Sequence, residues 1–316
     1  MREAIAFALI VAASACAQYP QGAGIAVPMA GDHRFAPSGK APTYTDRALT
    51  SVANAQAIRA HFWVPGLDDA YVPQGVAFGD GALWVATYRS ADPAQDRGAC
   101  RVFRVDPASG ALGGFFDLPP ECGHAGGSAW GGDGTLYVVD THVLFRIRVE
   151  DAMRAGRCTA ASCQSLKLGG VITGHFLAHG SGALWIGEYT RARDGPGRLW
   201  RVPLSAIDGL VAGGGALDQS FAQATLTVAA QSQGAAIAAD GALWLTQSGG
   251  TLGRLQRVDA ATGKVLAEYA MPAGIEDIEF APDGTLWATS EAGTQRWNRW
   301  ATFFPLVFAI DTAALR

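Results

Sequence analysis

A glycine turn followed by a Leu-aromatic pair recurs five times between residues 79 and 287. Four of the copies contain Asp-Gly, which adopts the positive φ angles that tight hairpin turns need. The apolar pair after each turn favours a strand. The pattern therefore predicts five β-hairpins in tandem, an arrangement typical of repeat folds. The aromatic residues lie 53, 48, 59 and 43 positions apart, at Trp84, Tyr137, Trp185, Trp244 and Trp287.

Further short strands flank each predicted hairpin. A strand of small residues precedes each turn, as in 75–78, and a third strand follows the hairpin, as in 101–106. A sixth copy would have to lie in the 59-residue interval, which is too short for two blades. The sequence therefore predicts an all-β fold, a β-propeller of four-stranded antiparallel blades, with five blades favoured. A fourth strand is expected in four copies, at 114–118, 165–168, 224–228 and 265–269.

The fifth copy reaches the end of the chain before a fourth strand. A ring of sheets leaves exposed edges unless it closes. The segment 58–64 precedes the first repeat and has the composition of a strand. We predict that this N-terminal strand closes the last blade, so that a propeller domain spans residues 57–316.

The N-terminal residues 1–17 have the features of a secretion signal: Arg2, an apolar run over 4–13, and small residues after it. Cleavage after Ala17 is one expectation, and a lipoprotein signal ending before Cys16 is the other. The second would make Cys16 a lipid anchor. Residues 18–56 are rich in Gly, Pro and Ala and are expected to form a flexible leader or tether. The protein is thus expected to be exported, either periplasmic or secreted, or held at the outer membrane as a lipoprotein.

Composition narrows the class of partner. Hydrophobic residues make up 49% of the 316, charged residues only 16%, and the net charge is −4. A nucleic-acid partner would require a basic face, so the sequence argues against one. No apolar segment after the signal is long enough to form a transmembrane helix. We expect a monomer with a small-molecule ligand.

The cysteines agree with export. Without Cys16 four remain, an even number that an oxidising compartment would pair. Cys100 starts a third strand and Cys122 follows the adjacent fourth strand, so an antiparallel pair brings them together. Cys158 and Cys163 share one loop. The strand register therefore predicts the disulfides Cys100–Cys122 and Cys158–Cys163.

Inner strands of a propeller begin on the face where the second strands end, and a funnel between them is the candidate site. His124, His142 and His175 fall on this face and are candidate catalytic bases. Any of these polar residues could instead bond a neighbouring blade, and Asp140 could cap a turn. A divalent cation, Ca²⁺ or Mg²⁺, is the expected cofactor, with candidate ligands Glu276, Asp277 and Glu188. Ligand contacts are expected from Gln74, Tyr88, Asp140, Gln233, Gln247 and Glu291.

Arginine and tryptophan residues follow the second strands and are predicted to rim the funnel. Arg89, Arg296 and Trp297 are the candidates for ligand contact. Arginines favour carboxylate or phosphate groups, and tryptophans favour flat rings or sugars. A solvated loop balanced by nearby aspartates is the alternative.

The stretch 237–291, with two Asp-Gly-x-Leu-Trp turns, resembles repeats of streptogramin B lyase-like propellers. The layout of residues 58–313 also resembles the SMP-30/gluconolactonase-like and strictosidine-synthase-like propellers. The resemblance implies a propeller, and by analogy a hydrolase or a lyase. SMP-30-like sites hold a metal with Glu, Asn and Asp on inner strands. This chain departs from that pattern, because Asn54 and Asn298 are its two asparagines and neither lies on a predicted inner strand.

Two functions of different classes follow from these features. One is an exported propeller that binds a small polar or anionic ligand in its funnel, as a metal-assisted hydrolase of the lactonase or esterase kind or as a lyase. The alternative is a non-enzymatic scaffold or recognition domain at the cell envelope. Histidines and acids that converge in the funnel would favour the enzyme. A funnel plugged by aromatics, with its acids paired to arginine, would favour the scaffold.

Overall fold

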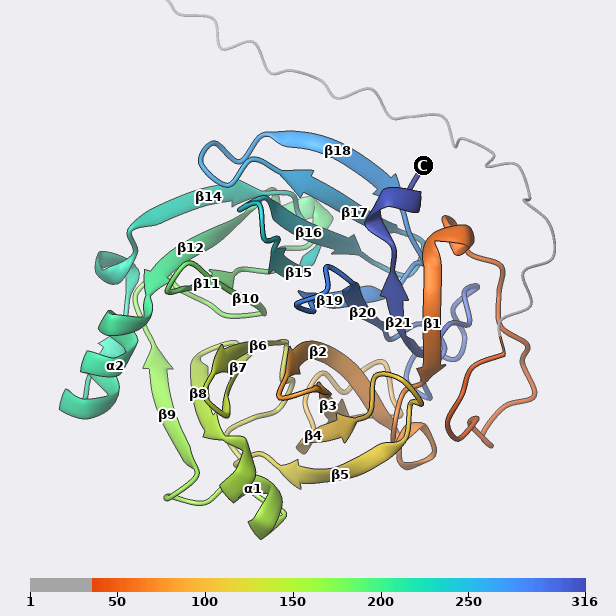
Figure 1. Cartoon of the computed structure of the whole chain (residues 1–316), viewed down its shortest axis with the longest axis horizontal. Helices are drawn as coiled ribbons and strands as arrows, with labels where there is room; N and C mark the ends of the chain where they lie inside the picture. The colour runs from red at the N-terminus through yellow and green to blue at the C-terminus, as the bar shows by residue number, and fades with distance from the viewer. Residues whose placement is uncertain (1–35) are drawn as a thin grey trace, which may run out of the picture. The chain divides into compact units, whose positions relative to one another are not determined.

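The computed structural model describes residues 36–316, and the five repeats fold into five antiparallel sheets around a common axis (Figure 1). Blade 1 contains β2 (Tyr71–Gly79), β3 (Ala82–Arg89), β4 (Cys100–Val105) and β5 (Leu112–Asp117). Blade 2 contains β6 (Gly127–Gly132), β7 (Thr135–Asp140), β8 (Val143–Arg148) and β9 (Cys163–Leu168). Blade 3 contains β10 (Phe176–Gly180), β11 (Ala183–Gly187), β12 (Gly197–Pro203) and β14 (Ala224–Val228). Blade 4 contains β15 (Ser232–Ile237), β16 (Leu243–Ser248), β17 (Gly253–Val258) and β18 (Val265–Ala270).

Blade 5 confirms the predicted closure. It contains β19 (Ile275–Phe280), β20 (Leu286–Ser290) and β21 (Leu306–Ile310), and its outer strand is β1 (Ile58–Trp63). β1 pairs antiparallel with β21, and Phe62 lies opposite Val307. Strands from the two ends of the propeller therefore lie side by side in one blade, and the five-bladed ring that the repeat predicts is confirmed.

The hairpin turns take the conformation that their sequences indicate. In the first copy Asp80 and Gly81 both have positive φ, at 50° and 70°. The second and third copies repeat this pattern. In the fourth and fifth copies only the glycine has a positive φ, as at Gly241, and the loop between the strands is longer. The glycine of the motif therefore occurs in two kinds of hairpin turn, a short one with two positive φ angles and a longer one with a single positive φ at glycine.

The repeated aromatic residues form the joints between blades. Each is buried in an apolar cluster that contains residues of its own blade and of the next blade along the chain. Trp84 of blade 1, for example, stacks on Trp130 of blade 2 with 6.2 Å between ring centroids. Trp287 closes the ring by packing near Phe62 and Val76. The motif thus specifies contacts between blades as well as the hairpins.

Two helices interrupt the strand pattern. α1 (Val149–Ala155) follows β8, and α2 (Leu204–Gly213) follows β12. α2 buries Ile207 between blades 2 and 3 and accounts for the longest interval in the repeat. A short strand, β13 (Ala216–Leu217), then pairs parallel with β9. Single 3₁₀ turns complete the described chain at Ala55–Ala57, Leu67–Asp69, Ala192–Asp194, Gln219–Phe221 and Thr312–Ala314.

Both predicted disulfides are present, Cys100–Cys122 in blade 1 and Cys158–Cys163 before β9. The described helices include none long and apolar enough to cross a membrane. The predicted signal peptide, including Cys16, lies outside the described residues. Residues 36–56 of the predicted leader lie against the propeller, where the Tyr44 hydroxyl donates to the carbonyl of Gly293.

Candidate functional site

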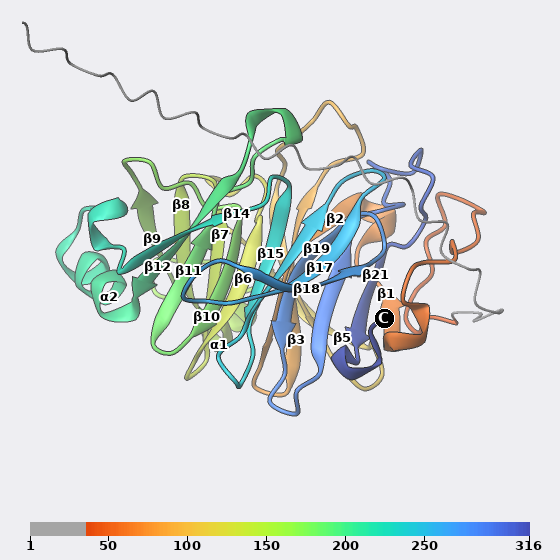
Figure 2. The same cartoon turned by 90° about the horizontal axis from the view of Figure 1, so that it is seen from above.

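A cavity of about 730 Å³ opens where the inner strands begin and the second strands end. In Figure 2 the blades are seen edge-on, with their strands running between the two faces of the ring. Four neutral polar or aromatic positions expected from the sequence line the cavity: Gln74, Tyr88, Gln233 and Trp297. Four ionisable ones also do so: His124, His175, Glu291 and Arg296.

One register rule describes how the second strands meet the cavity. The residue four positions after each repeated aromatic lines it, namely Tyr88, Thr141, Tyr189, Ser248 and Glu291. Successive side chains of a strand point to opposite faces, so the residue three positions after the aromatic belongs to the other face. Three residues expected in the site occupy that position and are absent from the lining: Asp140, Glu188 and Gln247.

Two glutamates from blade 5 meet below the cavity. Glu276, in β19, is fully buried, and Glu291, just after β20, is 7% exposed and forms part of the lining. The two carboxyl groups are close enough for the ionisation of each to affect the pKa of the other. Oε2 of Glu276 is buried and has no hydrogen-bond partner in the described chain. The two glutamates therefore form a coupled acidic pair with one accessible member, Glu291.

Neutral donors hold the pair in place. Oε2 of Glu291 accepts from Trp297 Nε1 at 2.7 Å and from Gln74 Nε2 at 3.1 Å. Oε1 of Glu276 accepts from Gln233 Nε2 at 3.4 Å. These donors come from blades 1, 4 and 5, so the position of the pair depends on several blades at once.

Burial sets the acidity of both carboxyl groups. Loss of solvation is the main cause that raises the pKa of Glu291 to about 7. Burial, followed by the charge of Glu291, raises the pKa of Glu276 well above its usual range. Glu291 can therefore exchange a proton near neutral pH, while burial favours the protonated form of Glu276. Such a difference between neighbouring carboxyl groups is typical of acid–base sites.

The histidines have different environments. Nε2 of His124 lies 2.9 Å from Oε1 of Gln74, and its Nδ1 lies 2.8 Å from the carbonyl oxygen of Asp96. Both ring nitrogens are thus engaged, and burial lowers the pKa of His124. Burial also lowers the pKa of His175 to about 4, and its Nδ1 accepts from the backbone N–H of Tyr189. His142 is exposed in the turn after β7 and is absent from the lining.

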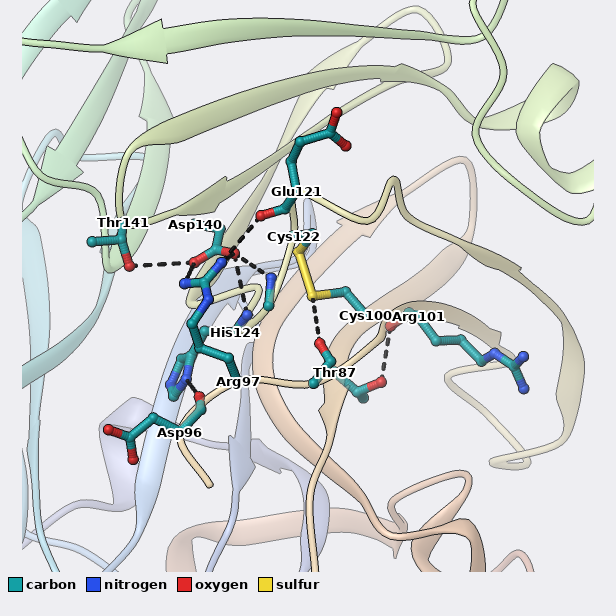
Figure 3. The surroundings of a disulfide bond; sticks show 12 residues. Thr87, Asp96, Arg97, Cys100, Arg101, Glu121, Cys122, His124, Asp140 and Thr141 are labelled. Carbon is teal, nitrogen blue, oxygen red and sulfur yellow. Dashed lines mark hydrogen bonds and ion pairs between the residues drawn. A yellow bond between two sulfur atoms is a disulfide. The ribbon is translucent and has the colours of Figure 1, made fainter. Parts of the chain in front are cut away.

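Asp140 supports the cavity wall from behind (Figure 3). Its carboxylate accepts from the backbone N–H groups of Gly123 and His124 and pairs with Arg97 at 3.0 Å. Figure 3 shows the Cys100–Cys122 disulfide beside this group, and it ties the segment that carries Arg97 to the turn that carries His124. Asp140 and the disulfide therefore fix the position of His124, and through it that of Gln74.

The candidate metal ligands do not meet. Glu188 pairs with Arg198 at 3.1 Å, and Oδ2 of Asp277 accepts from the backbone N–H groups of Val76 and Ser128. Within residues 36–316, one set of three potential ligand side chains has its ligand atoms within 4.8 Å of one another, Cys100, Cys122 and Asp140. Its cysteines form a disulfide. The side chains present therefore do not fit a site in which Glu276, Asp277 and Glu188 share one cation.

The arginines at the rim are largely occupied. Arg296 is buried, pairs with Asp96 at 2.7 Å and donates to the carbonyls of Pro93 and Gln95 and to the Tyr88 hydroxyl. Arg89 is exposed, donates to the carbonyl of Asp69 and does not line the cavity. Arg296 thus connects the loop after β20 to the loop after β3. The sequence interpretation placed this loop at the rim but named no ligand contact from Pro93, Asp96 or Arg97, and it missed Tyr189 and Gln231 in the lining.

The fold and this acidic cavity define a five-bladed β-propeller with a buried carboxyl pair in its central funnel. No family model and no curated protein matches the sequence. The structure is similar to that of glutaminyl cyclase from Myxococcus xanthus, with a TM-score of 0.52, 13% identity, and coverage of 80% of this chain and 94% of that one. Virginiamycin B lyase from Staphylococcus aureus matches with a TM-score of 0.37 and 15% identity over 74% of this chain and 81% of that one. A luciferin-regenerating enzyme matches with a TM-score of 0.46 and 10% identity over 81% and 96%. At 13% identity the match to the cyclase supports the propeller fold and no specific family.

Proposed function

We propose that this propeller is an enzyme that performs proton transfer on a small polar substrate held in the central funnel. The observation that supports it is the buried Glu276–Glu291 pair, whose member Glu291 lines an open cavity. Glu291 would be the general acid–base group, because it faces the cavity and has a pKa of about 7. Glu276 would tune the pKa of Glu291 as the buried carboxyl group beside it.

The reaction class that fits best is attack on a carbonyl group, as in hydrolysis or intramolecular cyclisation. Ionised Glu291 takes a proton from the attacking water, hydroxyl or amine while the new bond to the carbonyl carbon forms. It then delivers that proton to the leaving group as the old bond breaks, and returns to its ionised form. Proton transfer by one positioned side chain typically contributes about 10²–10⁴-fold to the rate.

Two alternatives fit less well. A metal-assisted step lacks a matching set of ligands, because Glu276, Asp277 and Glu188 do not converge on one point. A funnel closed by aromatics with its acids paired to arginine would have favoured a scaffold, but the cavity is open and Glu291 is bonded to Trp297 and Gln74.

The test is a substrate screen followed by pH–rate profiles. Lactones, esters, cyclic peptides and, by analogy with the cyclase, a peptide with an N-terminal glutamine are incubated with the purified protein and products are read by mass spectrometry. For any substrate turned over, kcat/KM should rise with pH through an apparent pKa near 7 that belongs to the pair.

Two matched variants separate the roles of the glutamates. Glu291→Gln should lower kcat/KM at least 100-fold. Glu276→Leu should remain active, but its profile should move to higher pH, because the interaction with Glu276 that lowers the pKa of Glu291 is removed. Wild-type profiles in both variants would overturn the assignment. Substrate binding without turnover would favour a recognition domain.

A further inference from the structure

The carboxylates that line the cavity differ in their partners. Asp96 pairs with Arg296, and Asp194 pairs with Arg193 at 3.7 Å. Glu291 accepts hydrogen bonds from the neutral N–H groups of Trp297 and Gln74. No Lys or Arg nitrogen of the described chain lies within 4.0 Å of its carboxylate oxygens. Its charge, once the proton leaves, is therefore not neutralised by an ion pair.

Two of the three arginines that line the cavity are engaged by the protein itself. Arg97 is held by Asp140 and by the carbonyl of Glu121. Arg296 is buried and hydrogen-bonded to Asp96 and to backbone carbonyls. The third, Arg191, is exposed. The arginines that the sequence suggests as anion ligands thus mostly bind groups of the protein itself.

Burial disfavours the charged form of both histidines that line the cavity. Burial holds the pKa of His175 at about 4, so this ring is neutral at neutral pH. Burial lowers the pKa of His124 as well, although nearby Asp140 opposes the change. The glutamate pair therefore lies in this cavity without a positively charged histidine, while the charge of the buried Arg296 lowers the pKa of Glu291.

Aromatic side chains surround this carboxylate. Tyr88, Tyr189, Trp297 and Trp300 all line the cavity. The guanidinium of Arg296 already lies over the rings of Tyr88 and Trp297, at 5.4 Å and 4.5 Å from their centroids, so Tyr189 and Trp300 are the rings offered to a ligand. Burial raises the pKa of Tyr189, and the charges of Glu276 and Glu291 raise it further. A carboxylate among aromatic rings is the combination that recognises ammonium groups, through an ion pair and cation–π attraction.

We propose that the cavity selects a small organic cation, with an ammonium group that binds the carboxylate of Glu291 among the aromatic side chains of the wall. The inference rests on the proposed function, because it makes the acid–base group also the anchor for the substrate. In that role, Glu291 would lie next to the amine whose proton it removes. The substrate class is then an amine, rather than the anion that the rim arginines suggest in the sequence.

Binding of three molecules with the same carbon skeleton tests the charge preference. Butylammonium chloride, butanol and sodium butyrate are titrated into the protein by calorimetry at pH 8 and constant ionic strength. Butylammonium should bind at least tenfold more tightly than the other two. Butyrate binding as tightly as butylammonium, or more tightly, would overturn the proposal.

Variants locate the binding. Glu291→Gln should weaken butylammonium binding at least tenfold, whereas Glu150→Gln, the same change on the exposed face of α1, should leave it unchanged. Binding that survives Glu291→Gln would also overturn the proposal. The outcomes separate the two proposals. Glu291-dependent ammonium binding without turnover of any amine would overturn the proposed enzyme function and support the preference for cations. Turnover restricted to anionic substrates would support the enzyme function and overturn the preference for cations.

Discussion

Glu291→Gln should stabilise the fold at neutral pH while it abolishes acid–base chemistry. The amide oxygen can still accept from Trp297 and Gln74, and the shape of the side chain is kept. The change removes a carboxyl group whose ionisation burial disfavours, because Glu291 is 7% exposed. The wild type loses stability when this group ionises inside the fold.

The size of the change in the free energy of unfolding follows from the linkage between proton binding and folding. A carboxyl group with a folded pKa raised above its unfolded value binds more protons in the folded state, so stability falls as pH rises between the two values. For Glu291 the window runs from 4.5 to about 7. At about 1.4 kcal/mol for each pKa unit, the wild type should lose about 3 kcal/mol across this window relative to Glu291→Gln. Below the window the two proteins should differ least.

Urea unfolding at several pH values between 4.5 and 8 measures this difference, with tryptophan fluorescence as the signal. Buried acids outside the pair, such as Asp277, affect both proteins alike, whereas Glu276 loses the charge of its neighbour, so the comparison reports on the Glu276–Glu291 pair. Glu150→Gln is the control, because its carboxylate is exposed and pairs with Arg154 at the surface. Wild type and Glu291→Gln curves that run parallel across the whole range would refute the claim that burial raises the pKa of Glu291.

Two further changes test the scaffold of the site. Replacing Cys100 and Cys122 by serine opens a loop of 22 residues, which should cost about 3 kcal/mol and weaken butylammonium binding by displacing the cavity wall. The matched change at Cys158 and Cys163 opens a loop with a sequence separation of 5, which should cost about 2 kcal/mol and leave butylammonium binding unchanged. Urea unfolding measures the stability of both variants, and calorimetry measures their binding. Equal binding by the two variants would show that the cavity wall does not depend on the Cys100–Cys122 disulfide. Asp277→Ala should destabilise the fold by about 3 kcal/mol, because two buried backbone N–H groups lose their acceptor. Asp277→Asn keeps an acceptor oxygen and should recover most of that loss in the same unfolding assay. An Asn variant as unstable as the Ala variant would show that the charge of Asp277 is required.

The fold could be predicted from the sequence because its signals are local and repeated. Each Asp-Gly-x-Leu-aromatic stretch specifies a hairpin, and the same aromatic fills the joint to the next blade, as Trp84 does. The missing fourth strand at the end of the chain identified its replacement, β1. The helix α2 was not predicted, because it lies in an interval where only the excess length marks an insertion.

The site could be predicted only in part, since its chemistry depends on which face a side chain joins. Tyr88 and Glu291 lie four positions after their repeat aromatics and line the cavity. Glu188, three positions after its aromatic, pairs with Arg198 instead, and its neighbour Tyr189 takes the place in the wall. Strict use of the strand alternation would have found Tyr189. The coupling between Glu276 and Glu291 had no signal in the sequence, because the two residues come from different strands.

The acidity of Glu291 is a property of the closed ring. Both carboxyl groups come from blade 5, whose outer strand β1 precedes blade 1 in the chain. Gln74 reaches Glu291 from blade 1, across the joint that this closure creates. On the outer side, Arg47 donates to backbone carbonyls of residues 298, 300 and 301, in the loop that follows Trp297. Opening the joint would remove the donor and admit water to the pair, and the desolvation that raises the pKa of Glu291 would be lost. A repeat whose motif is structural can therefore create a reactive group at the one joint where its two ends meet.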